Sequence, residues 1–242
     1  MKHLIWTHKK GDEGSLKSLL SRYSDQMKVH SLPVIQTSEI QVDEESFSKA
    51  KTLVSNAKEQ TLLVISSKNT LDFLVKNEKL TFLKSLPVIC VGKNTAKSCS
   101  DIGLKVLDHF NTTKDLSAHL SQINGIEHII IAGAKQRASK LEEISNGKFN
   151  FVVLNLYVTD AYTSNSISED LKKVLDSGNF SICFSSPSAV SSFRKQFQSF
   201  GVKQFAIGPT TAESIKAQGL SPIVSKEPTF ESLIEIASET IA

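Results

Sequence analysis

The sequence Val91-Gly92-Lys93-Asn94-Thr95-Ala96 returns in altered form as Ile207-Gly208-Pro209-Thr210-Thr211-Ala212. In both stretches an apolar run ends at a glycine, and a threonine and an alanine follow three and four residues later. A second glycine, Gly103 or Gly219, lies eleven residues after the first. An apolar run that ends at glycine and leads into a helical pattern is typical of a strand-to-helix turn. The repetition predicts two related α/β halves.

Two further matches extend this repeat. Val64-Ile65-Ser66-Ser67 corresponds to Cys183-Phe184-Ser185-Ser186, and the apolar residues that follow lie at equal offsets. Glu127-His128-Ile129-Ile130-Ile131 resembles Lys2-His3-Leu4-Ile5-Trp6, which requires a permuted order and places the N-terminus with the C-terminal half. The alternative is that any two α/β segments share loose periodicities.

Length and composition are those of an ordinary globular protein. The chain has 242 residues, of which 40% are hydrophobic and 22% charged, and its net charge is +3. We expect no membrane span, because no apolar run approaches the roughly 18 residues that one needs. We expect no nucleic-acid partner, because the sequence has no dense Lys/Arg stripe. Without a signal-peptide pattern we expect a cytoplasmic protein, and the three cysteines suit buried reduced thiols.

Strand-like and helix-like runs alternate along the chain, which favours parallel sheets covered by helices on both faces. The expected strands are 2–7, 28–40, 60–66, 87–91, 104–108, 127–132, 150–158, 180–185, 203–207 and 221–224.

Two expected strands, 28–40 and 150–158, are longer than the others and are interpreted as connections between the halves. The fold class is therefore α/β, with two similar parallel-sheet domains joined by a two-stranded β linker. The first domain comprises residues 1–34 and 159–242, the second is the inserted segment 38–152, and the linker strands are 35–37 and 153–158. Paired linkers of this kind predict a hinge with a cleft beside it.

The turns after four strands place hydroxyls and unpaired backbone N–H groups at the N-terminus of a helix, which is the positive end of the helix dipole. In open parallel sheets, ligands lie outside the carboxyl ends of the strands. The alternative is that each hydroxyl only caps its own helix. The candidate donors for carboxylates or phosphates are Ser66, Ser67, Gly92, Lys93, Asn94, Thr95, Ser185, Ser186, Gly208, Thr210 and Thr211.

Common catalytic motifs are missing. No dinucleotide fingerprint, P-loop or G-x-S-x-G elbow follows a strand. The six histidines are scattered without a pair at metal-binding spacing, so we expect no metal site. Tyr157 stands in the expected return linker, where a protonated phenol can donate to a departing hydroxyl. The alternative is that its ring only packs.

Together with Leu156-Tyr157-Val158-Thr159, the repeated strand-end motifs quoted above resemble those of uroporphyrinogen-III synthase, over nearly the whole chain. The resemblance implies two α/β domains joined by a two-stranded ladder. It also implies a cytoplasmic lyase of porphyrin and heme biosynthesis that uses neither cofactor nor metal. Such an enzyme converts hydroxymethylbilane to uroporphyrinogen III, with inversion of the last pyrrole ring and loss of water.

Residue by residue, the resemblance makes Tyr157 the group that assists departure of the hydroxyl. It makes the strand-end hydroxyls and amides the donors that hold substrate carboxylates, and it adds a charge contact from Lys135. We expect a monomer. The alternative function is a catalytically silent two-domain sensor or binding protein for a tetrapyrrole or another multi-carboxylate ligand.

Overall fold

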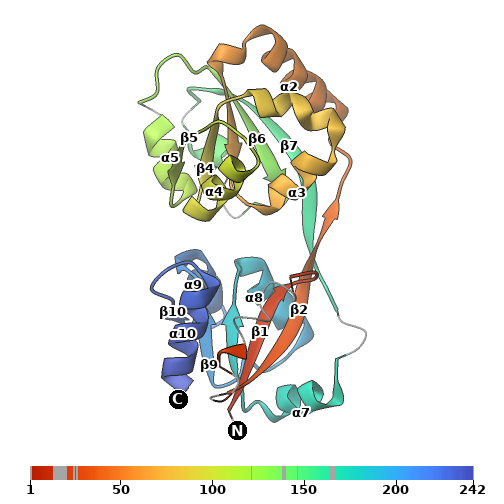
Figure 1. Ribbon diagram of the computed structural model, residues 1–242, viewed down its shortest axis with the longest axis vertical. Coiled ribbons are helices and arrows are strands. Elements are labelled where there is room, and N and C mark those ends of the chain that lie inside the picture. Colours follow the sequence, from red (N-terminus) through yellow and green to blue (C-terminus); the bar gives the residue numbers. More distant parts are fainter. Residues whose placement is uncertain are drawn as a thin grey trace. The chain divides into compact units, whose positions relative to one another are not determined.

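The computed structural model describes residues 2–12, 21–23, 25, 27–120, 122–137, 140–145, 147–163 and 167–241. Strands and helices alternate along these residues (Figure 1), and each of the ten expected strands is present. Neighbouring strands are mostly parallel. The chain therefore has a mixed α/β fold with a mostly parallel sheet, as the alternating pattern predicts.

The chain divides into two compact units, Met1–Thr37 with Thr159–Ala242, and Ser38–Val158. In the first unit the strand order is β10-β9-β8-β1-β2. These strands are β1 (His3–Lys9), β2 (Lys28–Glu39), β8 (Ser181–Phe184), β9 (Lys203–Ala206) and β10 (Ile223–Val224).

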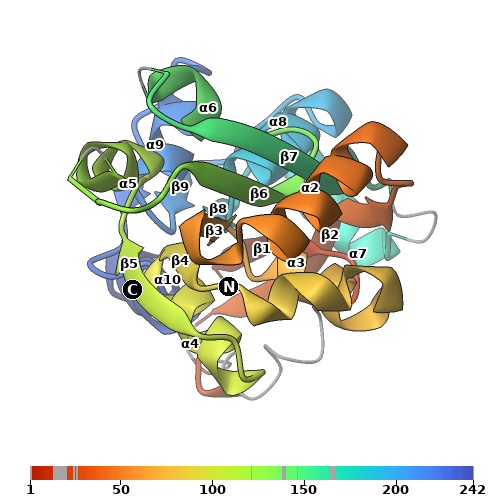
Figure 2. The same cartoon turned by 90° about the horizontal axis from the view of Figure 1, so that it is seen from above.

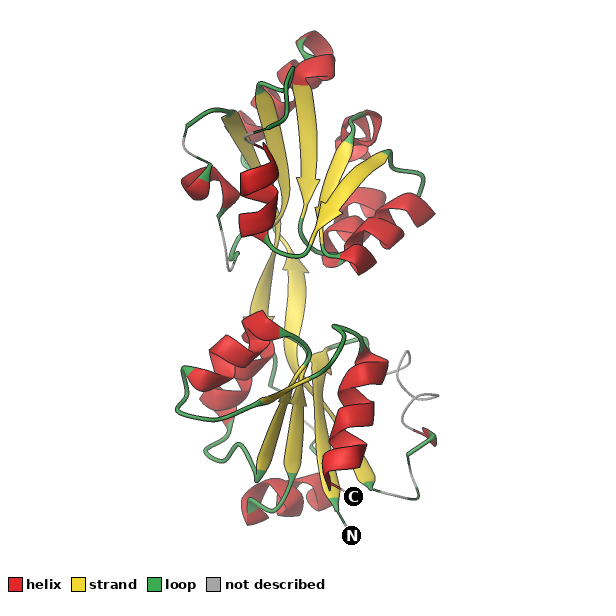
Figure 3. Ribbon diagram, turned by 90° about the vertical axis from the view of Figure 1, so that its left-hand side faces the viewer, coloured by secondary structure: helices red, strands yellow, loops and turns green. Residues whose placement is uncertain are grey.

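Helices cover both faces of the first unit's sheet (Figure 3). Ile5, Ile182 and Phe184 pack against one set of helices, whereas Leu4 and Trp6 pack against α10 on the opposite face. This alternation follows from the two-residue period of a strand. The helices of the first face are α7 (Glu169–Ser177), α8 (Pro187–Gln196) and α9 (Pro209–Lys216), and that of the second is α10 (Phe230–Ile241).

In the second unit the strand order is β7-β6-β3-β4-β5. These strands are β3 (Thr61–Ile65), β4 (Val88–Val91), β5 (Val106–Phe110), β6 (His128–Ala134) and β7 (Asn150–Ala161). The central strands β3 and β6 are apolar on both sides because both of their faces are covered (Figure 2).

One face of this second sheet packs on the helices that carry Leu71, Leu74 and Cys99, and the other on those that carry Leu116 and Leu141. The first group is α2 (Glu44–Asn56), α3 (Asn69–Lys76), the 3₁₀ helix η2 (Glu78–Ser85) and α4 (Lys93–Asp101), and the second is α5 (Thr113–Leu120) and α6 (Leu141–Ile144). A short 3₁₀ turn, η1 (Lys58–Gln60), leads into β3.

The two units share one strand order. If β8, β9, β10, β1 and β2 are matched with β3, β4, β5, β6 and β7, the order in the sheet is the same. The match pairs β1 with β6, which is the permuted correspondence that the sequence contains. Although β1 is N-terminal in the chain, it lies between β8 and β2 and pairs with both, as β6 does between β3 and β7 in the other unit.

Strands β2 and β7 are neighbours in the sheet. Within the first unit the Tyr162 N–H donates to the Val34 carbonyl at 2.8 Å, and within the second the Ile40 N–H donates to the Leu156 carbonyl at 3.1 Å. Residues Val153 to Asn155 and Tyr157, which the sequence analysis assigns to a linker, also pair with β6. This part of β7 therefore belongs to the second unit's sheet.

Across β1 and β2, the first unit holds two histidines in contact. His3 Nδ1 lies 2.9 Å from His30 Nε2, and His30 is 8% exposed. Burial, then the charges of His3 and Lys28, lower the pKa of His30 below 6.5, against a smaller opposing effect of Asp170. The folded state thus binds a proton at this position less readily than the unfolded state does.

The sign of this pKa shift predicts that the free energy of unfolding decreases as the pH falls below about 6.5, because the unfolded chain then takes up more protons. Replacing His30→Gln should flatten the decrease. Urea unfolding of both proteins at pH 7.5 and 5.5 measures the effect. Equal losses in the two proteins would show that His30 does not cause the pH dependence.

Candidate active site

The carboxyl ends of β3, β4 and β6 lie at one edge of the second unit's sheet, because these strands are parallel. Ser66 and Ser67 follow β3, Gly92 to Thr95 follow β4, and Lys135 follows β6. Tyr157 is at the same edge on β7, where it pairs with Ala134 across an irregularity in the register. The structure thus brings together the candidate residues of this unit, which lie far apart in the sequence.

The loop after β3 is closed by local hydrogen bonds. The Ser67 hydroxyl accepts from the Asn69 N–H at 3.2 Å, and the Ser67 carbonyl accepts from the Thr70 N–H at 3.1 Å. Ser66 is exposed and Ser67 half-buried. Ser67 therefore closes the turn that precedes α3 but is not its N-cap, which is Lys68, whereas the Ser66 side chain faces solvent.

The loop after β4 depends on a glycine. Gly92 has φ of 93°, a conformation that other residues adopt only at a cost, and it is the N-cap of α4. No side chain caps α4, although this stretch of the chain is fully described. Lys93 and Asn94 are exposed, and Thr95 is 7% exposed. The first-turn N–H groups of α4 therefore have no side-chain acceptor at the positive end of the dipole.

Behind this loop, Cys90 on β4 and Cys99 on α4 place their thiols 3.5 Å apart in the core. This contact, together with burial, raises the pKa of Cys90, so that its thiol stays protonated at neutral pH. The pair supports the loop by packing.

Tyr157 is 2% exposed, and its ring stacks on Phe73 with centroids 4.8 Å apart and planes inclined by 12°. Its carbonyl accepts from the Lys135 N–H at 2.8 Å, so Lys135 is held beside it while the lysine side chain is exposed. The tyrosine is consequently both a packed residue and a residue of the carboxyl edge. Its packing does not exclude an acid role, because catalytic hydrogen bonds often form only with substrate bound.

The first unit repeats the arrangement with β8 and β9. Ser186 caps α8, its hydroxyl accepting from the Ala189 N–H at 3.2 Å, and the Ser185 hydroxyl donates to the Thr7 carbonyl at 3.4 Å. Gly208 begins α9, where again no side-chain cap is present within this described stretch. Thr210 is exposed, whereas Thr211 is 3% exposed. In each unit, a serine lies just before one helix, α3 or α8. A glycine is the N-cap of the next one, α4 or α9, which has no side-chain cap.

Two residues near Tyr157 escaped the sequence analysis. Phe73 contacts Tyr157, but nothing in its spacing marks it, because stacking joins residues distant along the chain. Asn155 interrupts an apolar strand, which is a readable signal, and its buried Oδ1 has no hydrogen-bond partner among the residues that the structure describes. Such an atom is costly to bury and marks a place that warrants a functional explanation.

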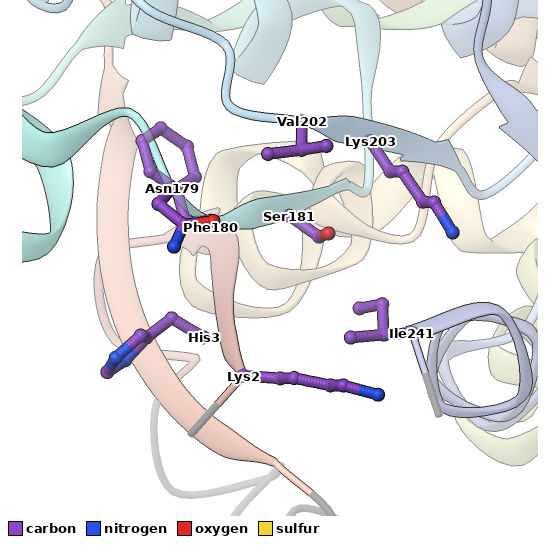
Figure 4. Close-up of a pocket in the computed structure, with 8 residues that line it drawn as sticks. All are labelled: Lys2, His3, Asn179, Phe180, Ser181, Val202, Lys203 and Ile241. Atoms are coloured by element: carbon purple, nitrogen blue, oxygen red, sulfur yellow. The ribbon is translucent and has the colours of Figure 1, made fainter.

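A cavity of about 230 Å³ lies at the opposite edge of the first unit's sheet (Figure 4). Lys2, Ser181 and Lys203, at or next to the starts of β1, β8 and β9, help to line it. Lys203 Nζ donates to the Thr240 carbonyl at 2.7 Å, so this ammonium group of the cavity lining is already bonded to the backbone. Ligands of parallel sheets bind at the other edge, and the cavity is therefore separate from the candidate site.

Among the described residues, no three His, Cys, Asp or Glu side chains are grouped to hold a metal ion. In the same part of the chain, no helix has the length and apolar character required to cross a membrane.

Comparison with protein families gives a match over residues 15–235 to the family described as uroporphyrinogen-III synthase HemD. No curated protein sequence matches the chain.

Among solved structures, the chain resembles uroporphyrinogen-III synthetase from Helicobacter pylori 26695, with 18% identity and a TM-score of 0.67 over 99% of this chain and 100% of that one. It also resembles a mutant uroporphyrinogen III synthase from the extremely thermophilic bacterium Thermus thermophilus, with 15% identity and a TM-score of 0.66 over 100% of this chain and 98% of that one. At these identities the likeness concerns the fold.

Proposed function

Because the chain belongs to the uroporphyrinogen-III synthase family, we propose that it converts hydroxymethylbilane to uroporphyrinogen III, with inversion of the last pyrrole ring and loss of water. The family is one of cofactor-independent cyclising lyases of tetrapyrrole biosynthesis. The observation that carries this conclusion is the family match over most of the chain. The repeated hydroxyl and amide donors at the carboxyl edge of each sheet support it.

The substrate has acetate and propionate side chains on every ring and is therefore a flexible polyanion. Carboxylates are stabilised by N–H groups at helix N-termini and by hydroxyl donors. We assign the uncapped starts of α4 and α9 to this role. The donors are Ser66, Ser67, Gly92, Lys93, Asn94 and Thr95 in one unit, Ser185, Ser186, Gly208, Thr210 and Thr211 in the other, with a charge contact from Lys135.

Tyr157 is assigned to the chemical step. The terminal hydroxyl of hydroxymethylbilane must depart as water, and a phenol that donates a hydrogen bond or proton to it lowers the barrier. The resulting cation then closes the ring. Because spontaneous closure yields the uninverted isomer, the main contribution of the protein is to orient the chain so that the inverted product forms.

The two compact units are proposed to be domains joined by β2 and β7, each of which continues from one unit into the other. The proposed boundaries are residues 1–34 with 159–242 for one domain and 38–152 for the second, with linker strands 35–37 and 153–158, the second of which also pairs with β6 of its own unit. Two hydrogen bonds between these strands, Tyr162 to Val34 in one unit and Ile40 to Leu156 in the other, support this assignment. We further propose a monomer in the cytoplasm, where three buried unpaired thiols stay reduced.

The product isomer tests the function. Freshly prepared hydroxymethylbilane is incubated with the protein, and after oxidation the uroporphyrin isomers I and III are separated by chromatography. We expect isomer III to predominate. An isomer mixture equal to that in buffer would instead identify a silent binding protein.

Replacing Ser186→Ala should both weaken α8 and impair substrate capture. Loss of the cap costs about 1 kcal/mol of stability. We expect in addition a KM several times higher, because the hydroxyl lies at the carboxyl edge, with little change in kcat. Steady-state rates and urea unfolding measure the two effects.

The matched control is Ser168→Ala. Ser168 caps α7 in the same way, its hydroxyl accepting from the Leu171 N–H at 3.2 Å, but α7 is tied to the start of β2 by the Lys28–Asp170 ion pair and not to the carboxyl edge. The control should lose similar stability at unchanged KM. If KM rises equally in both variants, Ser186 has no special role in binding.

A further inference from the structure

The contact between Tyr157 and Phe73 differs from the other aromatic contacts of the second unit. Tyr157 and Phe73 lie nearly parallel, at 12°. The rings of Phe110 and His119 are inclined by 36°, those of Phe149 and Phe151 by 77°, and those of Phe47 and Phe82 by 86°. A parallel, offset stack is a favourable arrangement of two aromatic rings. Because Phe73 stacks on one face of the phenol ring, the ring cannot tilt far without losing part of this contact.

Phe73 belongs to a helix that also serves the candidate site. Helix α3 begins at Asn69, two residues after Ser67, and the Ser67 hydroxyl accepts from the Asn69 N–H. Phe73 lies one turn further on, where Leu71 and Leu74 anchor the helix in the core. Helix α3 therefore links the loop of the proposed donors Ser66 and Ser67, which leads into it, to Phe73, which contacts Tyr157.

We propose that Phe73 is a positioning residue, which holds the Tyr157 phenol in a fixed place relative to the Ser66–Ser67 loop while the substrate hydroxyl departs. The inference rests on the proposed function, in which Tyr157 acts on the departing hydroxyl. Proton transfer to a leaving group requires donor and acceptor within hydrogen-bond distance, and a small misplacement of a reacting group costs a large part of the rate. Phe73 never touches substrate in this account and acts only through the tyrosine.

The first test is Phe73→Leu, which removes the flat ring and retains an apolar side chain. We expect kcat for uroporphyrinogen III formation to fall about 10-fold, with KM changed less than about 2-fold, as for loss of orientation alone. Phe73→Tyr, which retains the ring, should recover most of the wild-type kcat. An unchanged kcat in Phe73→Leu, or no recovery in Phe73→Tyr, would overturn the proposal.

Phe82→Leu is the control for a merely structural effect. Phe82 is also half-buried and also packs on another aromatic ring, that of Phe47, in the same core. Thermal unfolding should show a comparable loss of stability in the two leucine variants, while kcat falls only in Phe73→Leu. An equal fall in kcat in both would mean that loosened packing is the cause.

The double variant Phe73→Leu/Tyr157→Phe separates this inference from the proposed function. If Phe73 acts through the phenol hydroxyl, the double variant should be no slower than Tyr157→Phe alone. Suppose that Tyr157→Phe is slow and that the loss of kcat in the double variant equals the product of the losses in the two single variants. That result would overturn the role of Phe73 and leave that of Tyr157 intact. Wild-type turnover in Tyr157→Phe would instead overturn the acid role, and the positioning role with it.

Discussion

Tyr157→Phe is expected to form uroporphyrinogen III with a kcat about 10²-fold below that of the unaltered protein, the lower end of the contribution typical of a general acid. The substitution removes only the hydroxyl. The ring remains, and with it the stack on Phe73 and the buried position in the second unit's core. Thermal unfolding should therefore be nearly unchanged, which assigns the loss to chemistry.

Initial rates at saturating hydroxymethylbilane, with the isomers resolved, measure this effect. Tyr162→Phe is the control: it lies just beyond the end of β7, in the first unit, and its ring is 4.6 Å from the Lys10 ammonium, a contact that phenylalanine retains. Its turnover should equal that of the wild type. Should Tyr157→Phe match it, the phenol only packs, and departure of the hydroxyl needs another donor.

Gly201→Ala is expected to have the largest effect on stability, a loss of about 3 kcal/mol or more in the free energy of unfolding. Gly201 has φ of 72°, and a Cβ there would lie 2.1 Å from the Phe180 carbonyl oxygen and 2.6 Å from its ring. The backbone cannot yield easily, because that carbonyl accepts from the Val202 N–H and Phe180 is 2% exposed. The start of β8 would have to move.

Gly219→Ala is the control that separates the steric clash of an added Cβ from the energetic cost of a positive φ. Gly219 has a similar φ of 78°, but an added Cβ would meet no atom of the described part of the chain within 4 Å. This variant should lose only about 1 kcal/mol, the penalty of a left-handed conformation. Urea unfolding of the two variants measures the difference. Equal losses would show that the loop at Gly201 relaxes without disturbing Phe180.

Local patterns in the sequence were sufficient to predict which loops of the candidate site share one sheet edge. Gly92 and Gly208 mark strand ends because a turn into a helix favours glycine there, and all ten strands follow from apolar runs bounded by such turns. Parallel strands place every strand-end loop of a sheet at one edge, so the sequence pattern already groups Ser66, Thr95 and Lys135. The permuted match of residues 2–6 also predicted that the N-terminal strand joins the C-terminal half, and β1 indeed lies between β8 and β2.

Whether each hydroxyl caps a helix was not readable from the pattern. Ser186 caps α8, whereas Ser67 only closes the turn before α3, and Thr95 and Thr211 are buried in helices that no described side chain caps. All four residues nevertheless follow strands in similar contexts. The choice depends on side-chain torsions and on burial, which are set by neighbours that the local sequence does not specify.

By itself, then, the sequence determined the α/β class and the repeat, because these depend on periodicity and on turn chemistry, which are local. The family was indicated separately, by the resemblance of the strand-end motifs to those of its members, and the family match confirms it. Only the tertiary structure decided that Tyr157 is packed against Phe73 and that residues 153–157 join the sheet of the second unit. Contacts between distant segments arise from the way helices and sheets fill a common core, and no spacing along a single chain records which ring will cover which.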